Sequence, residues 1–172
     1  MKASTPFHLT LIRHAKSSWD NPNTADYYRP LNTRGYNNLP EMTERIIQRN
    51  LRPSLCITSG ATRAQATAKA VHRELRQVQP DLSLVLEDDL YEATPEALLR
   101  VIQRQDNQHE HLMLFGHNPG MHQLIELLTA ETLTKFPTCG IMHLSLTVSQ
   151  WSSVCSASGS VLWFDYPKLH KG

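Results

Sequence analysis

The stretch Phe7-His8-Leu9-Thr10-Leu11-Ile12-Arg13-His14-Ala15-Lys16, residues 7–16, decides the fold and points to the chemistry. Its apolar part has the length and composition of a short buried strand, which would deliver Arg13 and His14 to a strand's carboxyl end. Open α/β sheets bind ligands at that edge. An imidazole is a nucleophile toward phosphorus, and a guanidinium is a permanent, fork-shaped donor to phosphate oxygens. The pair indicates phosphoryl transfer through a phosphohistidine, whereas taken alone it also fits a strand-end salt bridge beside an ordinary histidine.

A second cation follows the next strand-like run, in Thr58-Ser59-Gly60-Ala61-Thr62-Arg63-Ala64. If Ser59 caps a helix, Arg63 lies in the opening turn, near the positive end of the helix dipole. An anion bound there would meet both the guanidinium and free backbone amides. The alternative is a solvent-facing helix arginine, which is what we expect of Arg73 and Arg76.

A third element is Leu114-Phe115-Gly116-His117-Asn118-Pro119-Gly120, in which an apolar strand runs into a glycine. Gly116 permits a tight turn, so His117 would stand at the strand's carboxyl end before the next helix. A histidine in a loop is usually only a polar loop residue. His117, however, shares its topological position with His14 and Arg63, and this favours a common site.

Strand-like runs alternate with helical patterns along most of the chain, which is typical of a parallel α/β architecture. We expect one domain over residues 1–172 with a three-layer α/β/α fold and a mostly parallel sheet. The C-terminal part is β-rich and predicts a hairpin-like pair, with an antiparallel member at the sheet edge. The expected strands are residues 7–12, 55–58, 82–86, 112–115, 141–148 and 160–165, and the expected helices lie around 39–47 and at 62–78, 95–103 and 121–128.

Local signals refine these elements. Pro40 should lie in the first turn of its helix or kink it. Thr94 is the expected N-cap of the helix that begins at Pro95, and Asn118-Pro119 is the expected cap and start of the last helix. The polar segment of residues 20–29 lacks apolar periodicity, so it should form a loop over the His14 edge and one wall of the site.

Composition excludes several classes of function. Seventeen basic and sixteen acidic residues give a formal charge of +1, so the chain lacks the basic surplus of a nucleic-acid binder. No stretch has the apolar length needed to cross a bilayer, and residues 1–5 are not followed by the apolar core of a signal peptide. The three cysteines are odd in number and widely spaced, which indicates reduced thiols, with Cys56 buried. We therefore expect a soluble, cytoplasmic protein with no membrane partner.

Metal chemistry is not indicated by the remaining histidines. The pairs at 109 and 111 and at 117 and 122 lack the helical spacing of a zinc motif, so we expect no metal and no other cofactor. The residues concerned are His8, His72, His109, His111, His122, His143 and His170.

Taken together, five stretches of the chain resemble the histidine phosphatase superfamily, and within it the small SixA-type phosphohistidine phosphatases. By that resemblance His14 is the nucleophile that becomes transiently phosphorylated, while Arg13, Arg63 and His117 hold the phosphoryl oxygens. Many superfamily members have glycine where this chain has Ala15, which is a small difference. The matching stretches, in family order, are residues 11–16, 29–35, 58–68, 90–93 and 116–119.

This division of roles agrees with the physics of the reaction. A transferring phosphoryl group spreads its charge over three oxygens, so two arginines and a histidine can stabilise it without a metal. His14 must be neutral to attack. Its other ring nitrogen should donate to a backbone carbonyl, and the nearby guanidiniums help to keep it uncharged.

Glu92 is the candidate general acid, because many superfamily members carry an acidic proton donor after the third strand. The alternative is a solvated carboxylate at a helix N-terminus. A phosphorylated imidazole that is protonated on its distal nitrogen leaves as neutral imidazole, whereas an alkoxide needs a proton. A weak acid at this position would therefore favour phosphoramidate substrates.

The sequence thus predicts a metal-independent phosphatase that acts on a phosphorylated substrate, most specifically phosphohistidine in proteins. A small-molecule phosphomonoesterase of the same superfamily is the enzyme alternative, and a phosphate-binding module without turnover is the non-enzyme alternative. Lys16, Arg29 and Arg34 could bind the rim of a substrate, with a solvated surface role favoured for Arg34.

Overall fold

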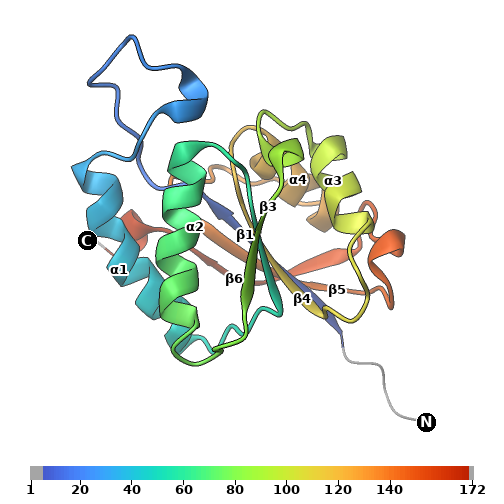
Figure 1. Cartoon of the computed structure of the whole chain (residues 1–172). Coiled ribbons are helices and arrows are strands. Elements are labelled where there is room, and N and C mark those ends of the chain that lie inside the picture. The colour runs from blue at the N-terminus through green and yellow to red at the C-terminus, as the bar shows by residue number, and fades with distance from the viewer. Residues whose placement is uncertain (1–5, 171–172) are drawn as a thin grey trace.

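The computed structural model of the chain describes residues 6–170, so the expectation about residues 1–5 lies outside the described part. Six strands form one sheet in the order β3-β2-β4-β1-β5-β6 (Figure 1). β1, β2, β3 and β4 are parallel, whereas β5 runs antiparallel to both β1 and β6. This is the predicted mostly parallel sheet with an antiparallel pair at one edge. The strands are β1 Phe7–Arg13, β2 Leu55–Thr58, β3 Ser83–Leu86, β4 His111–Gly116, β5 Ile141–Leu146 and β6 Gly159–Asp165.

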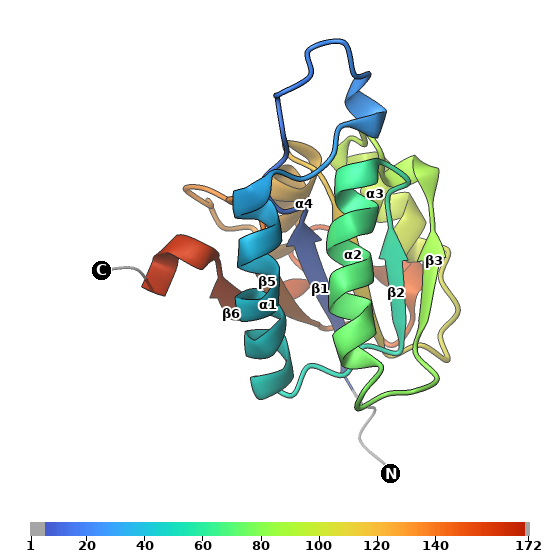
Figure 2. The same cartoon turned by 60° about the vertical axis from the view of Figure 1, so that its left-hand side comes forward.

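Two helices cover each face of the sheet, which confirms the three-layer prediction (Figure 2). α1 (Thr33–Gln48) and α2 (Thr62–Leu75) pack on one face, and α3 (Pro95–Gln103) and α4 (Gly120–Thr129) pack on the other. β1 contributes apolar side chains to both layers: Leu9 and Leu11 pack with α3 and α4, and Ile12 packs with α1 and α2. A strand buried on both faces reads as a continuous apolar run, as residues 7–12 do.

The helix boundaries correct two local predictions and exclude one of the two alternatives for Pro40. α1 begins at Thr33 behind Asn32, whose side chain accepts a hydrogen bond from the Gly35 amide at 2.8 Å, so Pro40 lies inside the helix rather than in its first turn. α2 ends at Leu75, three residues earlier than predicted. Asn118 does not cap α4, because its side chain donates to the Phe136 carbonyl at 2.9 Å instead.

The predicted cap of α3 and the predicted burial of Cys56 are confirmed. The Thr94 hydroxyl caps α3 by accepting a hydrogen bond from the Ala97 amide at 3.1 Å. Cys56 is buried and, like Cys139 and Cys155, is a free thiol. No helix within residues 6–170 is long and apolar enough to span a membrane.

The topology assembles one edge of the sheet from segments far apart in the chain. β2, β4 and β1 are neighbours and parallel, so their carboxyl ends lie side by side. The connection from β1 to α1, which contains a short 3₁₀ helix at Asp26–Tyr28, stands above this edge in both views (Figures 1 and 2).

Candidate active site

The four predicted site residues meet at this carboxyl edge. Arg13 is the last residue of β1 and His14 follows it, His117 follows β4, and Arg63 is the second residue of α2. The rings of His14 and His117 have centroids 5.2 Å apart. His14, Arg63 and His117 are each less than 10 % exposed. One half-buried and one buried guanidinium beside two buried imidazoles form a concentrated set of donors for an anion.

His14 is held as a neutral imidazole with one ring nitrogen left without a proton. Its Nδ1 lies 2.7 Å from the carbonyl of Ala15, and since a carbonyl can only accept, Nδ1 carries the proton and Nε2 presents a lone pair. The predicted backbone partner is thus confirmed. The pKa of His14 is lowered to about 3, chiefly because burial disfavours the imidazolium, with smaller contributions from His117, Arg13 and Arg63. The imidazole is therefore uncharged and able to attack at neutral pH.

His117 is oriented by Ser59, whose hydroxyl lies 2.8 Å from His117 Nε2. Ser59 Oγ also accepts a hydrogen bond from the Ala61 amide at 3.2 Å, so its own proton is available for the imidazole. Donation from Ser59 to Nε2 places the ring proton of neutral His117 on Nδ1, which is buried and has no partner among residues 6–170. Ser59 is therefore not the N-cap of α2, a position that Ala61 takes, but a support for His117.

The same imidazole is uncharged at neutral pH. Burial, and after it the nearby Arg63 guanidinium, lowers the pKa of His117 to about 4. His117 can therefore donate one hydrogen bond from Nδ1 to a phosphoryl oxygen without carrying a charge.

Arg29 joins the site from the loop between β1 and α1. Its side chain is buried and its guanidinium reaches the Ser17 hydroxyl and the Asp26 carboxylate. The Nε–H groups of Arg13, Arg29 and Arg63 are all buried without a hydrogen-bond partner among residues 6–170. Unpaired buried donors are costly, so three of them beside an unpaired imidazole N–H indicate a site built for a multiply charged anion.

Sequence reasoning placed Arg29 at the rim and did not single out Asp26, which contacts both Arg29 and Arg63. The available signal was the spacing of Asp26 and Arg29, which are three residues apart in a polar loop that was already expected to overhang His14. The loop of residues 20–29 thus forms the predicted wall of the site, and it also contributes the charged side chains of Asp26 and Arg29.

Glu92 is not joined to His14, Arg13, Arg63 or His117 by any hydrogen bond or ion pair within the described residues. It is exposed, in a turn with a positive φ of 51°. Its neighbour Tyr91 contacts the site instead: the Tyr91 ring lies edge-on to His117 with centroids 5.5 Å apart. Lys16 is half-buried, and Arg34 is exposed at the start of α1.

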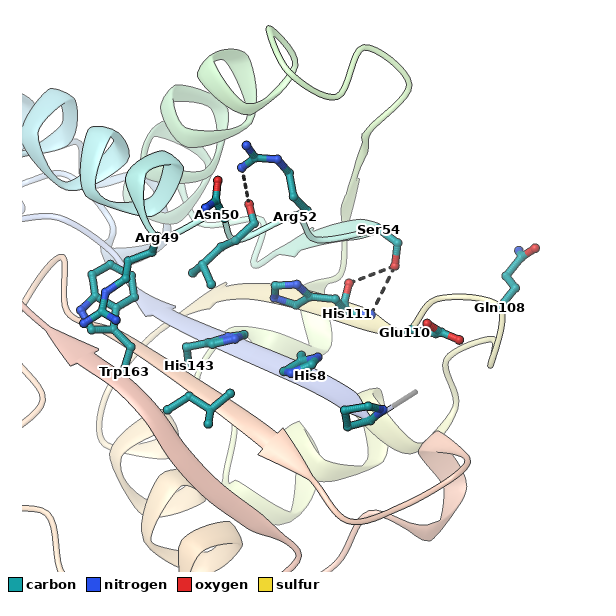
Figure 3. A pocket seen from close by; sticks show the side chains of 13 residues that line it. His8, Arg49, Asn50, Arg52, Ser54, Gln108, Glu110, His111, His143 and Trp163 are labelled. Atoms are coloured by element: carbon teal, nitrogen blue, oxygen red, sulfur yellow. Dashed lines mark hydrogen bonds between the residues drawn. The ribbon is translucent and has the colours of Figure 1, made fainter. Parts of the chain in front are cut away.

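A second histidine cluster occupies the opposite edge of the sheet, in a cavity of about 560 Å³ (Figure 3). His8, His111 and His143 come from the adjacent strands β1, β4 and β5. The Thr10 hydroxyl lies 2.7 Å from His111 Nε2 and 2.8 Å from His143 Nδ1, so these nitrogens meet a hydroxyl rather than a common metal position. No group of three His, Cys, Asp or Glu residues between positions 6 and 170 is placed to hold a metal ion.

The buried histidines predict acid-sensitive stability. Burial lowers the pKa of His14 and His111 to about 3 and of His117 and His143 to about 4, from an ordinary value of 6.5. As pH falls below 6.5, these histidines become protonated in the unfolded chain but stay neutral in the folded chain. Each of them therefore lowers the free energy of unfolding by up to about 2 kcal/mol at pH 5. Urea unfolding at pH 7.5, 6 and 5 should show a progressive loss, and a flat profile from pH 7.5 to 9 serves as the internal control. Equal stability at pH 7.5 and 5 would contradict the burial of neutral imidazoles.

Ser59→Ala tests the support of His117. Loss of one neutral hydrogen bond should lower the turnover number about threefold to tenfold, because the His117 proton is no longer fixed on Nδ1. Steady-state phosphate release measures the effect. Ser54→Ala, at the far edge of the sheet beside the His111 carbonyl, is the matched control and should leave the rate as it is. An unchanged rate in Ser59→Ala would mean that His117 needs no such support.

Comparison with known proteins agrees with this geometry. The family model of the histidine phosphatase superfamily (branch 1) matches residues 9–95. A solved structure from Agrobacterium tumefaciens, assigned to the SixA phosphohistidine phosphatases, has 28% sequence identity and a TM-score of 0.78, and the match covers 95% of this chain and 99% of that one. The protein histidine phosphatase SixA in complex with tungstate has 21% identity and a TM-score of 0.76, with coverage of 93% and 97%.

A curated relative, an uncharacterized chloroplastic protein of Arabidopsis thaliana, is 26% identical over an alignment of 164 positions that covers 90% of this chain and 73% of the relative. The family match spans half of the chain and includes residues 13, 14 and 63. The chain belongs to the histidine phosphatase superfamily. Within that superfamily its fold is of the SixA type, and membership implies a phosphatase that acts on a phosphorylated substrate.

Proposed function

We propose that the protein hydrolyses phosphohistidine, most specifically in proteins, through a phosphorylated His14 intermediate and without a metal ion. The observation that carries the proposal is the state of His14: a buried, neutral imidazole with Nδ1 bonded to the Ala15 carbonyl and Nε2 left to attack. The same site holds three buried guanidinium Nε–H groups that have no partner among residues 6–170. This combination supports an attack on phosphorus rather than a structural role.

The reaction divides into two displacements. In the first, His14 Nε2 forms a bond to phosphorus while the bond from phosphorus to the leaving nitrogen breaks, and the leaving imidazole, already protonated on its distal nitrogen, departs neutral. In the second, water attacks the phosphorylated His14, the P–N bond breaks, and inorganic phosphate departs. Arg13, Arg29, Arg63 and His117 are the proposed donors to the phosphoryl oxygens in both steps.

The test is a substrate panel: a protein that carries phosphohistidine, a phosphoserine peptide, a sugar phosphate and an aryl phosphate. Phosphohistidine should be hydrolysed fastest, an acid-labile phosphoenzyme should be trapped, and a chelator should change nothing. Faster hydrolysis of the sugar or aryl phosphate would favour the small-molecule phosphomonoesterase. Phosphate binding without any phosphoenzyme would indicate the non-catalytic binding module, and activity that needs an added divalent ion would contradict metal independence.

Glu92→Gln tests the leaving-group chemistry. General-acid help is needed in proportion to the basicity of the leaving group, so a donor at position 92 would matter most for an alkyl phosphate. Because Glu92 is exposed and lacks contacts with the four central residues, we expect less than about a threefold change on phosphohistidine. The rates of mutant and wild type are measured on alkyl phosphate, aryl phosphate and phosphohistidine, with Glu96→Gln as the matched control. A uniform loss on all three would mean that Glu92 binds substrate or supports the turn.

A further inference from the structure

Asp26 gathers three side chains of the site on one carboxylate. Its Oδ2 accepts hydrogen bonds from Arg63 Nη2 at 2.9 Å and from the Tyr91 hydroxyl at 2.6 Å, and its Oδ1 accepts from Arg29 Nη2 at 3.1 Å. The backbone carbonyl of Asp26 accepts two more, from Arg63 Nη1 at 2.7 Å and from the Arg29 amide at 3.1 Å. One loop residue therefore holds groups from three separate segments of the chain.

These contacts use the same part of both guanidiniums. Arg63 is bound through Nη1 and Nη2, and Arg29 is bound through Nη2 to Asp26 and through Nη1 to Ser17. The Nε–H of each arginine is left buried without a partner among residues 6–170. Asp26 thus fixes Nη atoms of both guanidinium groups. Because each guanidinium is planar and rigid, the direction of its remaining Nε–H is then fixed as well.

The carboxylate also sets the charge of the site. Burial alone would raise the pKa of Asp26, but hydrogen bonds from Tyr91, Arg63 and Arg29 overcome that effect and hold it well below its usual range. With His14 and His117 neutral, the three arginines and Asp26 leave two net positive charges. A phosphoryl group with two negative charges matches that number.

The 3₁₀ helix that carries Asp26 is anchored independently of the arginines. The hydroxyl of the adjacent Tyr27 donates to Asp88 at 2.7 Å, and the Tyr27 and Tyr91 rings meet edge-on at 5.0 Å. Gly60 leaves room for this contact, because a Cβ there would come within 2.1 Å of both the Asp88 carboxylate and the Tyr27 hydroxyl. The position of Asp26 is therefore determined by the fold and not only by the charges that it binds.

We propose that Asp26 is the positioning residue of the phosphate site: it holds Arg63 and Arg29 so that their Nε–H groups face the phosphoryl oxygens. The proposal rests on the proposed function, since it requires a phosphoryl group between these arginines. Asp26 does not itself touch the substrate. It acts through Arg63 and Arg29, so its removal should matter less once Arg63 is absent.

A double-mutant cycle tests this dependence. Asp26→Asn keeps the shape of the side chain but replaces one acceptor oxygen by a donor, and it should lower kcat/KM about 10- to 100-fold, because small displacements of a catalytic group are that costly. In an Arg63→Ala background the same change should cost less than about threefold, since only the longer contact with Arg29, at 3.1 Å, is left for Asp26 to act through. Asp26→Glu should recover part of the activity that Asp26→Ala loses.

Controls separate positioning from folding and from the proposed function. Asp20→Asn, on the same loop with an exposed side chain, should leave the rate as it is. Calorimetric titration with inorganic phosphate gives a readout without turnover, and Asp26→Asn should weaken phosphate binding about tenfold. A wild type that binds phosphate but lacks phosphatase activity would overturn the proposed function while phosphate binding still decides the role of Asp26.

Two results would overturn the positioning role. Equal losses from Asp26→Asn in the wild-type and Arg63→Ala backgrounds would show that Asp26 acts independently of Arg63. Tighter phosphate binding or faster turnover in Asp26→Ala would show instead that the carboxylate competes with substrate for the guanidinium.

Discussion

His14→Ala is expected to reduce turnover by about 10⁴-fold or more, because the substitution removes the attacking nitrogen and the two-step route has no other nucleophile. The arginines and His117 remain, so inorganic phosphate should still bind. The Ala15 carbonyl loses its partner, which should cost about 1–3 kcal/mol of stability. Phosphate release and the trapping of an acid-labile label together measure the effect.

His109→Ala is the matched control for this variant, because its ring lies outside both histidine clusters and the Trp151 indole donates to its backbone carbonyl, which the substitution keeps. His14→Asn preserves a side-chain donor near the Ala15 carbonyl, and should be equally inactive while remaining folded. Trapped label on His14→Ala at the wild-type level would refute His14 as the nucleophile.

The arrangement of the central site was accessible from the sequence because it follows from topology. Each of His14, Arg63 and His117 follows or nearly follows a short apolar run, and parallel strands bring their carboxyl ends to one edge. The residue at a strand end can be read from periodicity alone. Periodicity predicts only that these ends lie on the same side of the sheet. That they lie side by side depends on the strand order, in which β2, β4 and β1 are neighbours, and this order could not be predicted from the pattern.

Asp26 and Arg29 were harder to predict for a physical reason. The contacts of Asp26 reach across 37 residues to Arg63 and 65 residues to Tyr91, and Arg29 is bound to Asp26 in turn. A polar loop without periodicity carries no signal for contacts over such distances along the chain. The second histidine cluster was missed in the same way. His8 and His111 become neighbours through strand register, which spacing along the chain does not reveal.

Arg63→Ala is the variant with the next largest expected effect, a fall in kcat/KM of about 10²- to 10³-fold, which is typical for deletion of one preorganised donor to a developing charge. The reason is geometric: Arg63 is buried, its outer nitrogens are tied to Asp26, and its Nε–H remains for the phosphoryl group. Steady-state kinetics on phosphohistidine and calorimetric binding of phosphate measure the loss.

Arg63→Lys distinguishes the contribution of the positive charge at position 63 from that of the guanidinium geometry. Arg63→Lys keeps the positive charge, but an ammonium cannot bind Asp26 through two nitrogens and donate to a phosphoryl oxygen from a third. It should therefore recover less than about a tenth of the lost activity. Arg34→Ala, an exposed arginine at the start of α1, should change nothing. Full recovery with lysine would mean that the site needs only a positive charge at this position, and an unchanged rate in Arg63→Ala would remove Arg63 from the phosphate site altogether.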